Sequence, residues 1–169
     1  TGIKNRGKAA DNVTAGDLAV QASKKLFKNN NIPKSEIDFL IFVTQTPNQC
    51  LPSTSCEIHS ALGLKQECGA LDVNQGCTGY IYGLNLASSL VDSCSAKYVL
   101  LLTGDTYTKL LESDDQSVVP LFGDGASAAQ LTAGSSTGAM KDGTSSASQV
   151  TLLFENAGSD ASNVDVVMA

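Results

Sequence analysis

The sequence predicts an α/β protein in which helices cover both faces of a central sheet. Segments with helical spacing of apolar residues alternate with short extended segments along the chain. Two of the extended segments, residues 37–44 and 98–103, are almost continuously apolar, which is typical of strands buried on both faces. The alternation of the two kinds of segment indicates that they share one layered unit.

Composition places the chain among globular proteins and argues against two classes of function. Its 169 residues are 42% hydrophobic and 17% charged, enough for one domain with a substantial core. The net charge of −6 argues against nonspecific binding of nucleic acid. No stretch reaches the roughly 18–20 apolar residues of a membrane-spanning helix. The five cysteines include no C-x-x-C pair, so we expect reduced thiols, no metal site and a cytoplasmic protein.

The first elements are a helix and a strand. Thr14 can cap a helix over residues 15–28, since Asp17 stands at the third position after it, where a carboxylate helps. Three asparagines end this helix, and a turn at residues 32–36 leads into the apolar strand at 37–44.

A loop and a second helix come next. Ser53 is expected to cap the helix, and Gly63 to end it. Its predicted inner face consists of Ile58, Ala61 and Leu62. His59 is the single histidine of the chain, and we interpret it as a residue of the helix surface, because no partner that could orient a catalytic base stands near it in the sequence.

The stretch from 71 to 90 organises the rest of the chain. A strand at residues 69–73 enters a tight turn, and Cys77 follows in the predicted first turn of a largely buried helix. Unpaired backbone N–H groups and the helix dipole favour a thiolate there, which makes the thiol nucleophilic. Gly76 and Gly79 would leave room for a substrate or another backbone to approach the sulfur. The plain alternative is a small buried cysteine that only packs.

The pattern of the remaining sequence predicts further strands separated by turns. The predicted segments are the strand at 98–103, a short helix or turn at 106–111, an extended segment at 126–132, a short strand at 139–141 inside the Gly-, Ser- and Thr-rich stretch 133–149, and strands at 150–154 and 164–168.

Five ordered segments resemble a known family. Residues 72–80 (DVNQGCTGY) and 121–126 (LFGDGA) resemble motifs of the β-ketoacyl-acyl carrier protein synthase III family, in the thiolase superfamily. Residues 1–6 (TGIKNR) and the Leu-Pro-Ser at 51–53 are similar to further segments of it, and residues 167–169 to the segment before its linking helix. The resemblance implies a thiolase-like half, layered α-β-α around a mixed five-stranded sheet, with residues 1–169 as the N-terminal half-domain and the second half absent.

The resemblance also implies a reaction. Cys77 would take an acyl group from acyl-CoA and pass it to malonyl-acyl carrier protein by decarboxylative condensation in fatty-acid biosynthesis, with its backbone N–H in the oxyanion hole. Acyl-CoA is then a substrate, and no cofactor or metal is implied. Leu51 would reach into the acyl pocket of the partner in a homodimer, and the strand at 98–103 would pair across that dimer. Gln116 stands where many members carry an arginine near the nucleotide.

Two alternatives stay open beside this reading. The catalytic His and Asn of the family lie in its second half, so the chain alone is not expected to catalyse condensation. Leu51 and Gln116 leave room for a related thiolase-fold acyltransferase of secondary metabolism. A non-catalytic half that serves dimerisation or carrier-protein binding is the other alternative. No nucleic-acid or membrane partner is expected.

Overall fold

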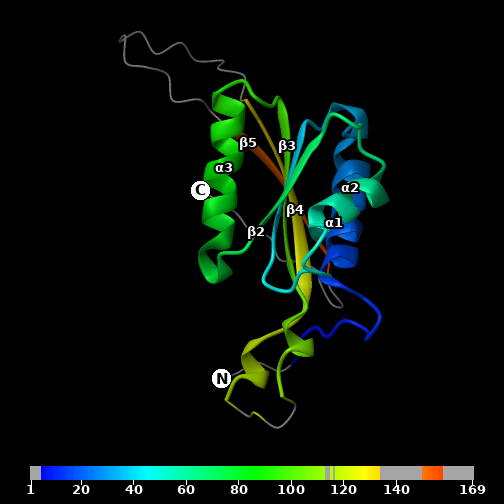
Figure 1. The fold of residues 1–169 in the computed structure, drawn as a ribbon, viewed down its shortest axis with the longest axis vertical. Coiled ribbons are helices and arrows are strands. Elements are labelled where there is room, and N and C mark those ends of the chain that lie inside the picture. The colour runs from blue at the N-terminus through cyan, green and yellow to red at the C-terminus, as the bar shows by residue number, and fades with distance from the viewer. Residues whose placement is uncertain (1–4, 113–114, 116, 134–149, 158–169) are drawn as a thin grey trace.

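Helices cover both faces of one sheet. The computed structural model describes residues 5–112, 115, 117–133 and 150–157. Helices α1 (Ala15–Asn30) and α2 (Thr54–Leu62) lie on one face of the sheet, and α3 (Gly79–Asp92) lies on the other (Figure 1). The predicted layered α/β arrangement is therefore confirmed.

The sheet is mixed, and its strand order follows from two crossovers. Its strands are β1 (Phe39–Val43), β2 (Gly69–Val73), β3 (Tyr98–Asp105), β4 (Gly125–Ala133) and β5 (Val150–Ala157), in the order β2-β1-β3-β4-β5. The strand β1 pairs in parallel with β2 and with β3, whereas the pairs β3–β4 and β4–β5 are antiparallel. The helix α2 connects β1 to β2, and α3 connects β2 to β3, because parallel strands require crossover connections.

The expectation that residues 98–103 pair across a dimer is wrong. These residues belong to β3, which pairs with β1 on one side and with β4 on the other. Its backbone groups are therefore used inside the sheet. Among the described strands, β2 lies at one edge of the sheet, because α2 carries the chain to the outer side of β1. The strand that precedes Cys77 thus has one unpaired edge among the described strands, as β5 has at the other end of the sheet.

Two apolar clusters fill the two sides of the sheet. Successive side chains of a strand point to opposite faces. Leu40 and Phe42 accordingly pack with α1 and α2, while Ile41 and Val43 pack with α3. The continuous apolar run at 37–44 is needed because both faces of β1 are covered.

The first two helices differ in how well their ends were predicted. Thr14 and Asp17 form the capping box of α1: the Thr14 hydroxyl accepts from the Asp17 N–H, and the Asp17 carboxylate accepts from the Thr14 N–H. Gly63 ends α2 with a φ of 64°. Ser53 occupies the N-cap position of α2, yet its side chain caps no backbone group. Ala61 is exposed and not on the inner face, because the short helix buries only one narrow side.

The helix after Cys77 is shorter and less buried than predicted. It begins at Gly79, after a 3₁₀ turn over Gly76–Thr78. Its buried positions are four apart along one stripe, and on the outer side Ile81 and Tyr82 are each 57% exposed. The helix is apolar nearly all round, but the described part of the chain covers only one of its sides.

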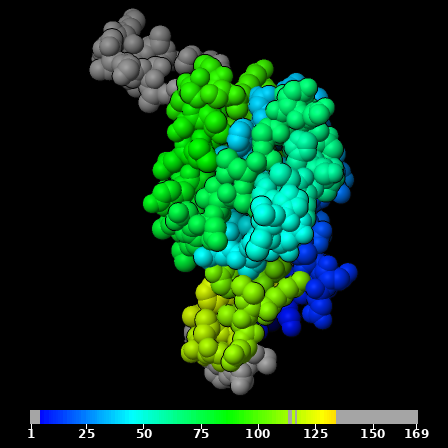
Figure 2. All heavy atoms as spheres, in the orientation of Figure 1, coloured from blue at the N-terminus to red at the C-terminus, as the bar shows by residue number. Residues whose placement is uncertain are grey.

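Between β3 and β4 the chain leaves the sheet. Two 3₁₀ turns, Tyr107–Lys109 and Val119–Leu121, lie in a part that extends beyond the end of the sheet, beside the N-terminal segment (Figures 1 and 2). The predicted strand at 150–154 lies within β5. The strand candidates at 139–141 and 164–168, and the first four residues of the resemblance, fall outside the described residues.

Candidate functional site

The Cys77 thiol is exposed at the junction of β2 and α3. It lies in the 3₁₀ turn and not in the first turn of the helix, which corrects the expectation from the sequence. The turn is closed by a hydrogen bond from the Thr78 hydroxyl to the Gln75 carbonyl oxygen, 3.0 Å long. Among the described residues the Cys77 thiol is therefore not packed into the core of this chain.

The two glycines beside Cys77 both stand where the chain is crowded. Gly79 is buried, and a Cβ on it would lie 2.5 Å from Val43 Cγ1, so its lack of a side chain lets α3 approach β1. Gly76 has a φ of 54°, in the left-handed region, and a Cβ on it would lie 3.0 Å from Gln45 Nε2. That either glycine also admits substrate remains a prediction.

Polar groups from the ends of β1 and β3 meet next to this turn. Asp105, the last residue of β3, accepts through Oδ1 the backbone N–H groups of Gln45 (2.7 Å) and Thr46 (3.0 Å), and the hydroxyls of Thr44 and Thr46 (3.0 Å each). The Gln45 side chain in turn accepts the phenol O–H of Tyr107. Sequence reasoning missed these residues, although Thr44 and Asp105 both stand at carboxyl ends of predicted strands.

Tyr107 is held as a neutral phenol. Its ring stacks on Phe122 with 4.8 Å between ring centroids. Burial raises the pKa of Tyr107, and the negative charges of Asp105 and of a Cys77 thiolate raise it further. The phenol therefore remains a hydrogen-bond donor at neutral pH, and it lies within electrostatic range of the Cys77 sulfur.

Leu51 stands on a tethered loop between β1 and α2. The Asn48 N–H donates to Thr54 Oγ1 at 3.0 Å, and the side-chain amides of Asn48 and Gln49 donate to the two carboxylate oxygens of Glu57, each at 2.7 Å. Leu51 is nevertheless 86% exposed. The structure thus presents an apolar side chain on a loop fixed at its base. Gln116, the other predicted substrate contact, lies outside the described residues.

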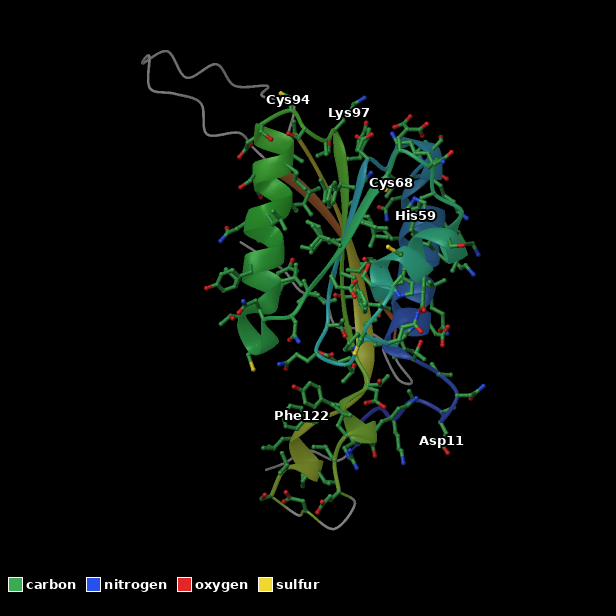
Figure 3. All side chains as sticks on the ribbon, in the orientation of Figure 1. Asp11, His59, Cys68, Cys94, Lys97 and Phe122 are labelled. Atoms are coloured by element: carbon green, nitrogen blue, oxygen red, sulfur yellow. The ribbon has the colours of Figure 1, made fainter. Side chains whose placement is uncertain are left out.

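The remaining titratable side chains that the sequence singled out lie away from this cluster. His59 lies on α2, and its Nε2 forms a 3.0 Å hydrogen bond with the Lys65 carbonyl oxygen. Figure 3 shows His59 near Cys68, on the α1–α2 side of the sheet. Burial raises the pKa of the Cys68 thiol to about 11. Within the described residues, no cluster of His, Cys, Asp or Glu could hold a metal ion. No helix in that part of the chain is long and apolar enough to cross a membrane.

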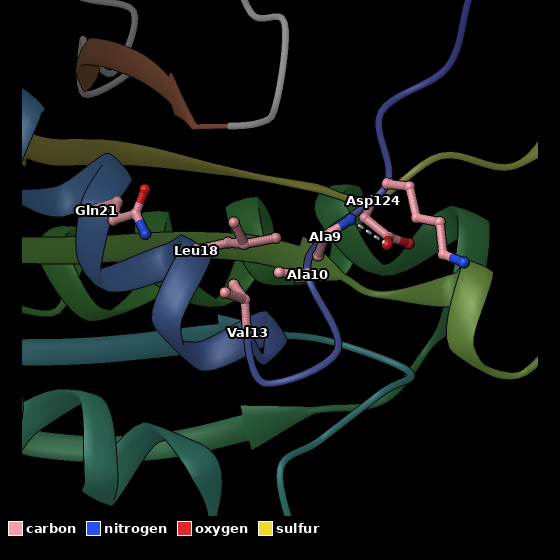
Figure 4. Close-up of a pocket in the computed structure, with 7 residues that line it drawn as sticks. Ala9, Ala10, Val13, Leu18, Gln21 and Asp124 are labelled. Atoms are coloured by element: carbon pink, nitrogen blue, oxygen red, sulfur yellow. Dashed lines mark hydrogen bonds between the residues drawn. The ribbon is translucent and has the colours of Figure 1, made fainter.

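A cavity of about 190 Å³ lies elsewhere, between the N-terminal segment and α1 (Figure 4). Its lining includes Leu18, Gln21 and the buried Asp124. The Asp124 carboxylate accepts the Ala9 N–H at 2.8 Å and both the N–H and the hydroxyl of Thr108, at 2.9 and 2.6 Å. These bonds fasten the N-terminal segment to the strand ends, so the aspartate has a structural role there.

Comparison with known proteins places these features in a family. Residues 71–148 match the family model described as 3-Oxoacyl-[acyl-carrier-protein (ACP)] synthase III. The chain is 41% identical over 138 residues to Beta-ketoacyl-[acyl-carrier-protein] synthase III of Xanthomonas oryzae pv. oryzae, covering 82% of this chain and 42% of that protein. It is 38% identical over 131 residues to the protein of the same name from Natranaerobius thermophilus, covering 78% and 40%.

Solved structures agree with the sequence matches. A 3-oxoacyl-(acyl-carrier-protein) synthase III crystal structure superposes with a TM-score of 0.78 at 49% identity, over 80% of this chain and 40% of that one. The synthase III of Pseudomonas aeruginosa PAO1 gives 0.74 at 33% identity, over 82% and 42%. The matched part of the chain spans only about two fifths, 40–42%, of the length of these curated relatives.

Proposed function

Because the chain belongs to the 3-oxoacyl-[acyl-carrier-protein] synthase III family, we propose that it is the nucleophile-bearing part of a condensing acyltransferase of fatty-acid biosynthesis. The observation that carries this proposal is the exposed Cys77 thiol, in the turn between β2 and α3. It lies inside the stretch that matches the family model. Acyl-CoA and malonyl-acyl carrier protein are the proposed substrates, and the cytoplasm, where thiols stay reduced, is the proposed location.

Two bond exchanges make up the proposed reaction. The Cys77 thiolate attacks the thioester carbon of acyl-CoA, the new C–S bond forms, and coenzyme A leaves as a thiolate that takes up a proton. The backbone N–H of Cys77 stabilises the tetrahedral oxyanion. Malonyl-acyl carrier protein then loses CO₂, and its carbanion attacks the acyl carbon, so that the β-ketoacyl product forms and the Cys77 thiolate is released.

The other predicted site residues take roles around this sulfur. Gly76 and Gly79 border the approach to Cys77, and Gln116 would contact the nucleotide end of acyl-CoA. Leu51 would enter the acyl pocket of a second copy in a homodimer, and its exposure on a tethered loop supports that role. The open edge of β2 supports pairing of the two copies along this strand.

A further region of the complete protein is needed for the condensation step. We place residues 1–169 as its N-terminal half-domain, in keeping with a span of 42% of the Xanthomonas oryzae relative. The exposed apolar side of α3, with Ile81 and Tyr82, is the surface that the second half would cover. That half would also supply the His and Asn that polarise the malonyl thioester, so the chain alone should not decarboxylate malonyl-acyl carrier protein.

A second candidate keeps the nucleophile and changes the acceptor. Gln116, at a position where the family often has arginine, and Leu51 leave room for a thiolase-fold acyltransferase that forms another bond, such as an ester or amide in secondary metabolism. Both candidates load Cys77 from an acyl thioester. Incubation of the loaded complete protein with malonyl-acyl carrier protein separates them, since only the condensing enzyme releases CO₂.

Mass spectrometry of the complete protein after incubation with acetyl-CoA, or with a longer acyl-CoA, tests the loading step. The expected result is one acyl adduct in wild type that is absent in Cys77→Ala. Cys94→Ala is the matched control, because Cys94 is also exposed, and it should keep the adduct. An adduct that persists in Cys77→Ala would refute the assignment of the nucleophile. No adduct with any acyl-CoA would favour a non-catalytic role in dimerisation or carrier-protein binding.

A further inference from the structure

The backbone position of Gln45 is fixed by the neighbouring strand. Residue 45 is the second after β1, and Asp105 closes β3, which runs parallel to β1 with Val43 opposite Thr103. The Gln45 N–H donates to Asp105 Oδ1 at 2.7 Å, the shortest of the four hydrogen bonds at that oxygen. A hydrogen bond to a carboxylate is stronger than one between neutral groups. The start of the loop that carries Gln45 is therefore anchored to the end of β3.

The side chain of Gln45 is then set by two contacts. Its Oε1 accepts the O–H of Tyr107, whose ring is stacked on Phe122. Its Nε2 is the Gln45 atom nearest to the place where a Cβ on Gly76 would stand, at 3.0 Å, while Cδ and Oε1 are each at 3.3 Å. The amide therefore turns its acceptor toward Tyr107 and lies against the residue that immediately precedes Cys77, with Nε2 slightly nearer than Oε1.

From this geometry we infer that Gln45 is a positioning residue for the Cys77 nucleophile, with its amide orientation set by Tyr107. A donor at this place has two effects on the reaction. An N–H dipole beside the turn stabilises the negative charge of the thiolate. The side chain also fills the space above Gly76, which stands at a φ of 54°, and so restricts the conformations of the turn. This inference rests on the proposed function, because it treats Cys77 as the nucleophile.

A donor role can be told apart from space filling by comparing two substitutions. Gln45→Met keeps the bulk of the side chain but removes the donor without adding charge, whereas Gln45→Ala removes donor and bulk together. If the side chain only fills space, the methionine variant should react as fast as wild type. If it acts as a donor, the methionine variant should be slowed as much as the alanine variant, since neither stabilises the thiolate.

The measurement is the rate at which iodoacetamide alkylates Cys77 in the native complete protein, read peptide by peptide, with the exposed Cys94 as the reference thiol in each sample. One hydrogen bond of ordinary strength corresponds to about a three- to tenfold change in rate. We expect Gln45→Ala, Gln45→Met and Tyr107→Phe each to slow Cys77 by about that factor. Tyr107→Phe should add nothing in the Gln45→Ala background. Gln21→Met, the same change at an exposed position on α1, should leave the rate unchanged.

Two results would overturn the inference. One is a Gln45→Met protein whose Cys77 reacts as fast as in wild type. The other is a Gln45→Ala protein whose Cys77 rate stays within about twofold of wild type, well below the expected effect of one hydrogen bond. Alkylation needs no acyl-CoA, so failure of the proposed function would appear separately, as a missing acyl adduct in the loading assay while the order of the alkylation rates is still measured.

Discussion

Asp72 should stabilise the fold far more than its place in a short edge strand suggests. It is the fourth residue of β2, and its two carboxylate oxygens accept the backbone N–H groups of Thr54 and Ser55, each at 2.8 Å. These are the first two residues of α2, whose N–H groups have no partner within the helix. Both residues are fully buried, so water cannot readily replace the carboxylate.

The expected cost of Asp72→Ala follows from those two bonds. A hydrogen bond to a charged group contributes about 1.5–3 kcal/mol, and a lost N-cap costs about 0.5–2 kcal/mol. Because the two bonds share one carboxylate that is partly exposed, we take the lower end for each and expect a loss of about 3 kcal/mol in the free energy of unfolding. Asp72→Asn keeps one acceptor and should lose about half as much.

Urea unfolding followed by far-ultraviolet circular dichroism measures this loss as a shift of the midpoint at unchanged slope. Ser53→Ala is the matched control, because Ser53 stands at the N-cap position but its side chain caps no backbone group. We expect it to cost about 1 kcal/mol or less, because it removes only neutral side-chain hydrogen bonds, to Ser55 Oγ at 3.0 Å and to Cys56 Sγ at 3.2 Å. A larger effect from Ser53→Ala than from Asp72→Ala would refute the assignment of the cap to the strand residue.

Gly79→Ala would place a Cβ 2.5 Å from Val43 Cγ1 and should lower the free energy of unfolding by about 1–3 kcal/mol; a urea midpoint equal to wild type would contradict the close approach of α3 to β1. Burial alone would raise the pKa of Asp38, but hydrogen bonds from Lys65 and from two backbone N–H groups outweigh it and leave the pKa below its ordinary value. The stability that Asp38 contributes is therefore complete above the unfolded-state pKa of about 3.9 and is lost as the pH falls through the lower folded-state value. Asp38→Asn should flatten the dependence of the unfolding free energy on pH in that acid range, and an unchanged acid slope would count against these contacts. Burial raises the pKa of Cys68 to about 11, so iodoacetamide at about pH 8 should leave Cys68 unmodified in the native protein and modify it after unfolding.

Local sequence signals located the helices and strands, but a comparison of the caps of α1 and α2 shows what such signals cannot predict. The capping box of α1 was predicted because Thr14 and Asp17 are three residues apart and complete each other. The cap of α2 was not, because its carboxylate comes from residue 72, 18 residues beyond Thr54. Ser53 matched the local pattern equally well, so the pattern alone could not exclude it. Caps supplied by another element become visible only once the strand register is known.

The helix after Cys77 shows a second limit. Its apolar residues occur on nearly all sides, and apolarity all round predicts a buried helix. In the described structure one side packs on the sheet, and Ile81 and Tyr82 on the other are exposed. The apolar pattern predicts that both sides of the helix are buried, but it does not indicate which segment buries each side. The pattern is therefore equally consistent with burial by another segment of the complete protein and with burial in the core of this chain.

The site itself combines a residue that sequence could single out with residues it could not. Cys77 was predicted in the first turn of a helix that follows a strand and a tight turn, and its neighbours resemble a family motif. Gln45 and Tyr107 meet only because β1 and β3 run in parallel and end at the same edge of the sheet. The carboxyl ends of neighbouring parallel strands are where loops converge on ligands in open α/β sheets. A search for polar residues directly after each predicted strand would have placed Thr44, Gln45 and Asp105 together, and with them the support of the Cys77 turn.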